Sequence, residues 1–343
     1  MDRRHWRATR HQYIERHSGA VRDERLYGDS LVAFLYADLH ERAPALYRWA
    51  TSAAASRLLA WLNYDSMLGS RAAGVRAFLA VCGVDLAECV EPAERLDTAR
   101  KLFERQIRYW DCRPMSEDPS VVASPADARV LVGSLCDVST LCLKGKFFDL
   151  DDLVGRDRAP WRAAFEGGDF AILRLTPDKY HYNHVPVDGR VVDFYEIPGG
   201  YHSCNPGAVV SVVTPHSKNR RVVTILETDL SGASAVGTVA MIEVAALMVG
   251  DICQRYSADR YTAPQPVRPG MWLRKGAPKS LFRPGGSTVV LLFQRRRVSF
   301  AEDIVANMRR ADVESRLSHG LGQPVAETDV AVRSELARSV GRP

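Results

Sequence analysis

The sequence lacks the cysteine pattern of a disulfide-stabilised protein. Its 343 residues include seven cysteines, which is an odd number, and none of them forms a CxxC pair. Scattered cysteines of this kind indicate free thiols in a reducing compartment. We therefore expect a cytoplasmic location.

Hydrophobic segments of the length needed for export or membrane crossing are also missing. The chain starts Met1-Asp-Arg-Arg4 and no apolar segment follows, so we expect no signal peptide. No apolar run reaches the roughly 20 residues that a transmembrane helix requires. Any contact with the cell membrane is therefore expected to be peripheral.

The charge distribution is not typical of a nucleic-acid-binding protein. The formal net charge is +5, but acidic residues are mixed throughout and the basic residues lack interleaved aromatics. Two basic clusters stand out, Asn219–Arg221 and Arg295–Arg297. Each fits either an anionic lipid surface or a solvated strand end. We expect no nucleic-acid partner.

The hydrophobic pattern changes along the chain and predicts an α+β protein. Residues 1–115 are rich in Ala, Leu and Arg, with helical spacing over Ser30–Ala50 and Ala54–Val81. After a polar linker near residue 115, short β-branched runs separated by Gly and Pro predict an antiparallel, β-rich domain over residues 116–325. Residues 326–343 are expected to form a polar tail that frays.

The N-terminal helical region carries two strongly apolar segments, Leu31–Tyr36 and Leu58–Leu62. Such surface can dock on a bilayer, on the domain that follows, or on a second copy in a homodimer. The sequence alone leaves these alternatives open.

A Gly-Ser-Thr sequence between a glycine-rich turn and an apolar run is the most informative feature. Gly285 and Gly286 allow backbone conformations that other residues avoid. The carbonyl of Gly286, directly before Ser287, is unhindered. An internal N-to-O acyl shift requires such a carbonyl next to a hydroxyl. Taken alone, the segment also fits a strand that is entered through a Gly-Gly turn, with Ser287 and Thr288 as turn residues.

Two histidines and an aspartate form the second group of candidate site residues. His181 and His184 lie three residues apart, so on an extended strand they point to opposite faces, and we expect different roles for them unless a bend brings them together. A zinc site is weakly supported, because no third ligand stands at a usual spacing, and we expect no metal. Asp127 fits a turn residue or an acid that orients a histidine.

Taken together, these segments resemble the phosphatidylserine decarboxylase family of pyruvoyl-dependent enzymes. Six segments occur in the family's order, and the similarity spans residues 118–325, with a weaker match at Tyr13–Arg16 and Tyr27-Gly28. The six segments are Ser124–Asp127, Leu143–Gly155, Tyr180–His184, His202–Pro206, Val239–Gly250 and Gly286–Thr288.

The resemblance implies two reactions. In the first, Ser287 attacks the carbonyl of Gly286, with His184 as the base and Asp127 orienting it. The resulting ester is opened by elimination, which leaves dehydroalanine at position 287 and separates residues 1–286 from residues 287–343. Hydrolysis then releases ammonia and leaves a pyruvoyl group on residue 287. In the second reaction, this carbonyl binds the substrate amine and accepts the electron pair released with carbon dioxide. His181 is the candidate that returns a proton.

Several positions depart from the family pattern around the expected pocket. Ala128, Cys204, Ala245 and Leu247 replace the usual Gly, Val, Gly and Thr, and Asp251 stands where a small residue is usual. The segment Lys275–Phe282 lacks a Glu and a second Gly. Because these departures surround the expected pocket, they bear on the identity of the substrate more than on the type of reaction.

We interpret the chain as a self-processing decarboxylase that converts phosphatidylserine to phosphatidylethanolamine on an anionic membrane surface. Its partners would be the lipid, its own two cleaved chains and, in one alternative, a second copy in a homodimer. Two other functions remain open. One is decarboxylation of a soluble amino acid, and the other is a non-catalytic binding role on the same fold.

Overall fold

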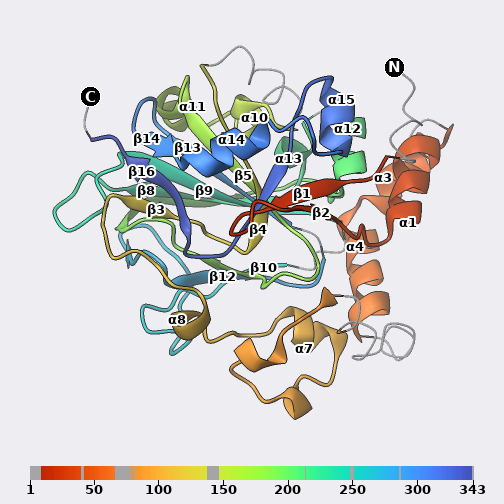
Figure 1. Ribbon diagram of the computed structural model, residues 1–343, viewed down its shortest axis with the longest axis horizontal. Coiled ribbons are helices and arrows are strands. Elements are labelled where there is room, and N and C mark those ends of the chain that lie inside the picture. Colours follow the sequence, from red (N-terminus) through yellow and green to blue (C-terminus); the bar gives the residue numbers. More distant parts are fainter. Residues whose placement is uncertain are drawn as a thin grey trace.

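A ten-stranded sheet runs through the centre of the protein (Figure 1). The computed structural model describes residues 9–39, 42–65, 79, 82–136, 147–212, 214–247, 251–285 and 287–341. Helices and mostly antiparallel sheets make it an α+β protein, as predicted. Parts of the expected helix Ala54–Val81 and of the motifs at Leu143–Gly155 and Val239–Gly250 lie outside the described residues.

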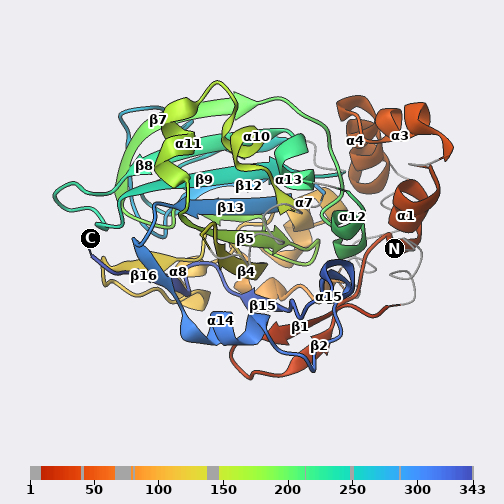
Figure 2. The same cartoon turned by 90° about the horizontal axis from the view of Figure 1, so that it is seen from above.

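The order of the strands in the central sheet differs from their order along the chain (Figure 2). Every described pairing in this sheet is antiparallel except the one between β1 and β15. From one edge to the other the strands are β11 (Trp272–Leu273), β7 (Gly189–Ile197), β8 (Arg221–Glu227), β9 (Thr238–Ala245), β13 (Ser287–Phe293), β5 (Asp169–Leu175), β4 (Ala128–Ser134), β15 (Glu327–Val330), β1 (Gln12–Glu15) and β2 (Val21–Asp23).

Two three-stranded antiparallel sheets cover one face of the central sheet. Val289 and Leu291 of β13 share an apolar cluster with residues of both small sheets, such as Phe282 and Leu336. The first small sheet contains, in order, β10 (Ile252–Gln254), β12 (Pro278–Phe282) and β6 (Tyr182–His184). The second contains β14 (Val298–Phe300), β16 (Glu335–Ser339) and β3 (Val121–Ala123).

Helices cover the opposite face, where Val290 and Leu292 of β13 pack in a second apolar cluster. Both faces of β13 are therefore buried, which explains its continuous run of apolar residues. The helices on the C-terminal side of the chain are α10 (Leu150–Val154), α11 (Ala159–Phe165), α12 (Pro206–Ser211), α13 (Pro215–Lys218), α14 (Glu302–Met308) and α15 (Arg316–Leu321). Of these, α14 packs beside β4 and β15 instead.

The remaining helices come from the N-terminal third, and α1, α3 and α4 stand together at one end of the central sheet (Figure 2). They are short, and within the described residues no helix combines the length and the apolar character that a bilayer crossing needs. They are α1 (Asp29–Ala33), η2 (Phe34–Leu39), α3 (Pro44–Ala50), α4 (Ala53–Ala60), η3 (Trp61–Asp65), η4 (Leu86–Glu88), η5 (Ala93–Arg95), α7 (Ala99–Phe103) and α8 (Tyr109–Cys112).

The two ends of the chain depart from the sequence prediction. The N-terminal region is not purely helical, because it also supplies β1 and β2 to the central sheet. The expected fraying of the polar tail is wrong. Glu327–Val330 lies between β4 and β1, and Leu336 and Ala337 of β16 are buried. Glu327 is polar yet buried because it is paired with Arg174. A strand that contains such a residue cannot be predicted from the pattern of hydrophobic residues.

Candidate active site

The candidate site lies where strands of the central sheet end together. Ser287 is the first residue of β13, and its register partners are Leu175 at the end of β5 and Ala245 at the end of β9. Gly285 precedes it with a φ of 140°, a conformation that favours glycine, as the sequence predicted. Gly286, the other residue of the predicted cleavage bond, lies outside the described residues.

The side chain of Ser287 is fully buried, and its hydroxyl has no hydrogen-bond partner among the described residues. Opposite residues of antiparallel strands share a face, as do residues two apart. Ser287 is therefore on the same face as Val289, toward the small sheet that contains His184. A buried hydroxyl without a partner is unusual and calls for a functional explanation.

His184 is held in one neutral tautomer. Its Nδ1 lies 2.8 Å from the carbonyl oxygen of Gly276, and its Nε2 lies 2.9 Å from the Tyr180 hydroxyl. Because a carbonyl only accepts, Nδ1 carries the proton and Nε2 accepts one from Tyr180. Burial lowers the pKa of His184 to about 3, although the hydrogen bond to Gly276 opposes the shift. The ring is therefore a neutral base at pH 7.

Asp127 lies near His184 but does not bond to it. The His184 amide donates to the carbonyl of Pro125 at 2.7 Å, so the two segments are adjacent as predicted. The Asp127 carboxylate instead accepts from the Val332 amide at 2.7 Å and from Arg113 at 2.9 Å. Burial would raise the pKa of Asp127, but the Arg113 guanidinium holds it below the usual value. The carboxylate acts on His184 only through its charge in this structure.

His181 occupies a different environment, as the three-residue spacing predicted. It is fully buried, and its ring stacks on Phe103 of α7 with the ring centres 3.6 Å apart. Neither ring nitrogen has a hydrogen-bond partner of normal geometry among the described residues. Burial, reinforced by the charge of Arg105, lowers the pKa of His181 well below its usual value, and this outweighs a weak opposing contribution from the Lys179 backbone.

The sequence analysis missed a buried ion pair on the same face as Ser287. Glu243, two residues before Ala245 in β9, lies 2.7 Å from the ammonium of Lys279 in β12. Both side chains are fully buried, and Ser280, Asn183 and Gln254 also donate to the carboxylate. The available signal was a glutamate inside the apolar run of β9, because a buried carboxylate needs a partner. The segment that lacks the family's usual Glu and Gly supplies this partner.

A second missed network ties the two ends of the chain together. The Arg174 guanidinium donates to Glu24 at 2.7 and 2.8 Å and to Glu327 at 2.9 Å. His11, Glu24 and Glu327 place their ligand atoms within 4.8 Å of one another, a spacing that could hold a metal ion. The Arg174 guanidinium already pairs with both carboxylates, and Arg129 lies 3.6 Å from Glu24, so we infer a structural role for this cluster.

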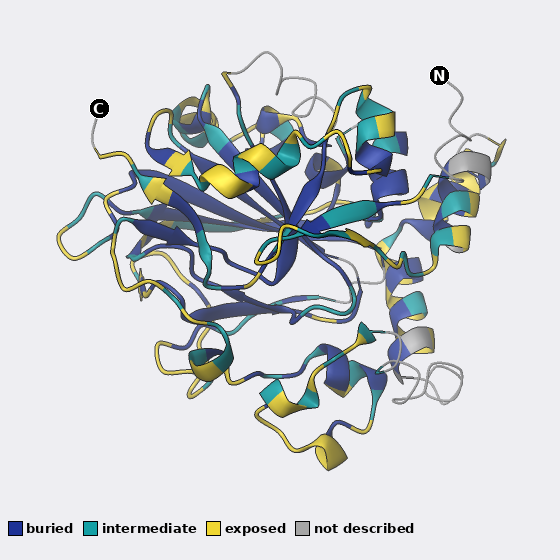
Figure 3. Cartoon of the chain, viewed as in Figure 1, coloured by how far each residue is buried: buried dark blue, intermediate teal, exposed yellow. Residues whose placement is uncertain are grey.

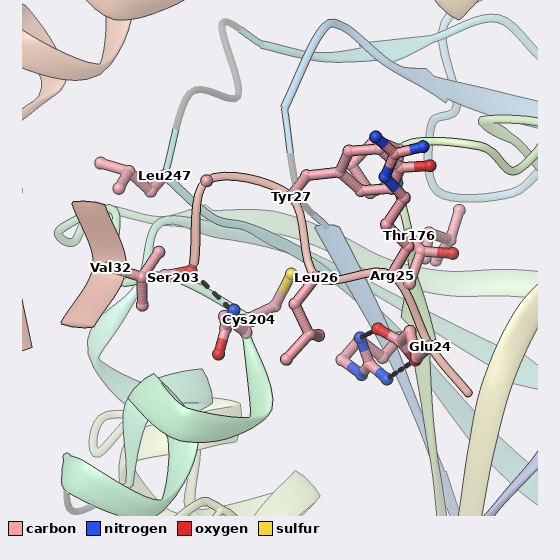
Figure 4. Close-up of a pocket in the computed structure, with 14 residues that line it drawn as sticks. Glu24, Arg25, Leu26, Tyr27, Val32, Thr176, Ser203, Cys204 and Leu247 are labelled. Carbon is pink, nitrogen blue, oxygen red and sulfur yellow. Dashed lines mark hydrogen bonds and ion pairs between the residues drawn. The ribbon is translucent and has the colours of Figure 1, made fainter. Parts of the chain in front are cut away.

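A pocket of about 80 Å³ lies beside the end of β5 (Figure 4). The N-terminal segment Glu24–Gly28 forms one wall, while Leu175, Cys204 and Leu247 contribute to the others. Two positions that depart from the family pattern, Cys204 and Leu247, thus line a pocket next to the register partner of Ser287. Burial raises the pKa of the Cys204 thiol to about 11, so it stays protonated.

Two arginines of the predicted basic clusters are structural. Arg221 is buried and donates to the carbonyls of Leu153 and Asn219 at 2.9 and 2.8 Å. Arg297 is also buried and paired with Asp229. These two arginines are therefore unavailable to a lipid surface.

Comparison with known proteins agrees with this geometry. The family model described as phosphatidylserine decarboxylase matches residues 99–318. The phosphatidylserine decarboxylase proenzyme of Chlamydia trachomatis is 30% identical over 314 residues, covering 91% of this chain and 96% of the relative. That of Fusobacterium nucleatum subsp. nucleatum is 28% identical over 312 residues, covering 90% and 95%.

A plant relative, phosphatidylserine decarboxylase proenzyme 2 of Oryza sativa subsp. japonica, is 34% identical over 242 residues, which are 69% of this chain and 36% of the relative. The matches define a class of enzymes made as proenzymes. The chain belongs to the phosphatidylserine decarboxylase family.

Proposed function

We propose that this chain is a self-processing, pyruvoyl-dependent carboxy-lyase that converts phosphatidylserine into phosphatidylethanolamine and carbon dioxide. The observation that carries the proposal is Ser287. Its hydroxyl is buried and has no partner in the described structure, it follows Gly285, and it faces the layer that holds His184. The names of the relatives supply the substrate.

In the processing step, the Ser287 hydroxyl attacks the carbonyl of Gly286. His184 is the base, because Gly276 fixes its proton on Nδ1 and leaves Nε2 to accept one. Tyr180 now occupies that position. The serine proton therefore reaches His184 either after Tyr180 moves or through its hydroxyl. The negative charge of Asp127 favours the protonated histidine.

The described residues fit a pyruvoyl group at position 287. The residue is buried at the start of a central strand and makes no side-chain hydrogen bond that a carbonyl group would break. The group supplies a carbonyl that binds the substrate amine and takes up the electron pair released with carbon dioxide. The apolar surroundings exclude water from that chemistry.

His181 is the residue that we assign to proton return after carbon dioxide leaves. Its neutral ring has both nitrogens free of normal hydrogen bonds in the described structure, and Phe103 fixes its plane by stacking. The amide of Phe282 donates to the His181 carbonyl at 3.1 Å, close in the chain to the cleavage segment.

The two products of cleavage are expected to stay together. Residues 287–343 contain β13, which lies between β9 and β5, and β15, which lies between β4 and β1. Removing either strand would expose the edges of a buried sheet and its apolar clusters. The processed enzyme is thus a complex of its own two chains.

The N-terminal helices offer a surface for peripheral membrane contact. Phe34, Leu46, Trp49 and Trp61 are each more than half exposed, and Figure 3 shows exposed residues along these helices. Aromatic residues beside exposed aliphatic ones are suited to a lipid interface. We propose that this face rests on the cytoplasmic side of the cell membrane, while contact with a second copy remains the alternative occupant.

The intact mass of the denatured protein tests the proposal. We expect two chains broken between Gly286 and Ser287, with the smaller one carrying the pyruvoyl mass. Ser287→Ala should remain a single chain. Thr288→Val is the matched control, because Thr288 points to the other face of β13 and should leave cleavage intact.

A single uncut wild-type chain would contradict the proposal and favour a non-catalytic role. If cleavage occurs, the rates of carbon dioxide release from phosphatidylserine vesicles and from free serine separate the lipid substrate from a soluble one.

A further inference from the structure

A second pocket opens at the same end of the central sheet, next to the N-terminal helices. It encloses about 520 Å³, and its walls include four arginines, Asp251 and Trp61. The arginines come from segments far apart in the chain and are Arg57 in α4, Arg100 in α7, Arg220 before β8 and Arg283 after β12. Only the folding of the chain brings these four side chains together.

The pocket lies close to residue 287. The carbonyl of Arg220 accepts from the Ala245 amide at 2.9 Å, and Ala245 is the register partner of Ser287. Neighbouring strands are about 4.8 Å apart, so the Arg220 backbone is roughly 10 Å from that of Ser287. Arg283 precedes the cleavage segment directly, and its amide donates to the Asp251 carbonyl at 3.0 Å.

Within the described residues, the carboxylates seen to pair with these four arginines are Glu104, Glu196 and Asp251. Arg220 is paired with Glu196 and, at 3.1 Å, with Asp251. Glu104 lies 2.8 Å from Arg100 and 3.9 Å from Arg283, so the second contact is weak. Arg57 is exposed, and its side chain forms no hydrogen bond or ion pair in the described part of the chain. The pocket therefore has capacity for one more anionic group.

We propose that this arginine pocket binds a phosphate ester, namely the phosphodiester of the phospholipid substrate, while its amine reaches residue 287. Guanidinium groups bind phosphate oxygens in pairs and are poorly replaced by other cations there. Only a few bonds separate the phosphorus of a phosphatidylserine from its amine. The flexible arginine side chains bridge the remaining distance to the sheet end. This inference rests on the proposed function.

The surroundings of the pocket agree with a lipid ligand. Trp61 lines the pocket and is 53% exposed on the apolar helical face. A lipid bound there would place its acyl chains along that face and its phosphate among the arginines. Asp251, one of the departures from the family pattern, fixes Arg220 at 3.1 Å.

Binding of glycerophosphoserine, the soluble head group with its phosphodiester, provides the test. We would titrate it by calorimetry into the purified wild-type protein and into Ser287→Ala, and compare it with free serine and with inorganic phosphate. We expect it to bind at least about 10-fold more tightly than serine, because each arginine adds a charge-assisted hydrogen bond. It should also bind more tightly than phosphate.

Two variants locate the site. Arg57→Gln combined with Arg283→Gln should weaken glycerophosphoserine binding by roughly 10- to 100-fold. Arg48→Gln removes the same charge from α3 of the same helical layer but outside the pocket, and should change binding less than about 2-fold. Cleavage of each variant, read by intact mass, shows whether the fold and the processing site are preserved.

The outcomes separate the two proposals. Equal effects of the double variant and of Arg48→Gln would overturn the phosphate pocket, whatever the enzyme does. Inorganic phosphate binding as tightly as glycerophosphoserine would reveal a general anion site and would overturn the assignment to substrate. The absence of cleavage in the wild-type protein contradicts the proposed function alone, since the titration into Ser287→Ala does not depend on processing.

Discussion

Two groups of buried polar residues differ in how completely they are paired. Around Arg174, the carboxylates of Glu24 and Glu327 both accept from one guanidinium, and the cluster joins β5, β15 and the residue after β2. Around residue 287, the Ser287 hydroxyl and both His181 nitrogens have no normal partner among the described residues.

We interpret the paired residues as stabilising the fold and the unpaired residues as candidates for the reaction. Fully paired buried charges hold strands in place, and removing one partner leaves the other charge stranded. Unpaired buried groups lower stability slightly and persist where a reaction uses them. Removing residues from the two groups should therefore have opposite effects on the free energy of unfolding. All measurements below use the uncleaved Ser287→Ala chain, so that unfolding involves one polypeptide.

Arg174→Met should have the largest effect. It leaves Glu24 and Glu327 buried and close together, and we expect the free energy of unfolding to fall by about 3–5 kcal/mol. Urea unfolding followed by circular dichroism measures this. Arg338→Met is the control, because Arg338 is paired with Glu335 at the surface and should matter much less. Equal losses in the two variants would show that burial of the Arg174 cluster contributes little.

Lys279→Met should have the next largest effect. It removes the cation from the buried Glu243 carboxylate, although Gln254 and Ser280 still donate to it. We expect a loss of about 2–4 kcal/mol. Adding Glu243→Leu should recover most of this loss, since the stranded charge is then gone. A double variant as unstable as the single one would indicate that packing, and not charge, explains the loss.

Lowering the pH should destabilise the fold through its buried neutral histidines. Burial lowers the pKa of His184 to about 3 and that of His216 to about 4. Below about pH 6.5, the unfolded chain binds protons that the folded chain does not, so stability is complete above that pH and falls as the pH drops toward 4. Each histidine contributes up to about 1.4 kcal/mol per pH unit.

Urea unfolding at pH 7.5 and 5.0 measures the slope. His216→Leu should reduce the slope of stability against pH by up to about 1.4 kcal/mol per pH unit, because one titrating group is lost. The stability at pH 7.5 should be less affected. An unchanged slope would mean that His216 is protonated in the folded protein.

His181→Phe should have the smallest effect on stability, with the opposite sign. It keeps an aromatic ring that can stack on Phe103 and removes two buried nitrogens that have no normal partner in the part of the chain that the structure describes. We expect stability to be unchanged or to rise by up to about 1 kcal/mol. In the cleavable chain, the same change should leave processing intact and abolish decarboxylation. A loss of several kcal/mol would place His181 with the paired, structural residues.

The sequence predicted the local features of the site well. Gly285 takes the left-handed φ expected of it, Ser287 begins a buried strand, and the segments of Asp127 and His184 are adjacent. These features depend on a few neighbouring residues with restricted backbone choices. The order of the motifs also indicated the family, which the comparisons confirm.

Long-range partners were not predictable in the same way. Asp127 bonds to Arg113 and to the Val332 amide, whereas the sequence suggested His184. Lys279 and Glu243 are 36 residues apart and meet only because two sheets stack. The strands at Glu327–Val330 and Glu335–Ser339 were mistaken for a polar tail. In the first strand Glu327 is buried through its ion pair with Arg174, and in the second only Leu336 and Ala337 are buried.

By itself, the sequence determined the α+β class and indicated candidate reactive residues, since both follow from residue types and short-range periodicity. The tertiary structure decided which of those residues meet. It buried the side chains of Ser287 and His181 without a hydrogen-bond partner among the described residues, paired Asp127 with Arg113, and gathered four arginines beside the strand that starts at residue 287. The reason is physical, because desolvation and pairing depend on segments that only the stacked sheets and the N-terminal helices bring together.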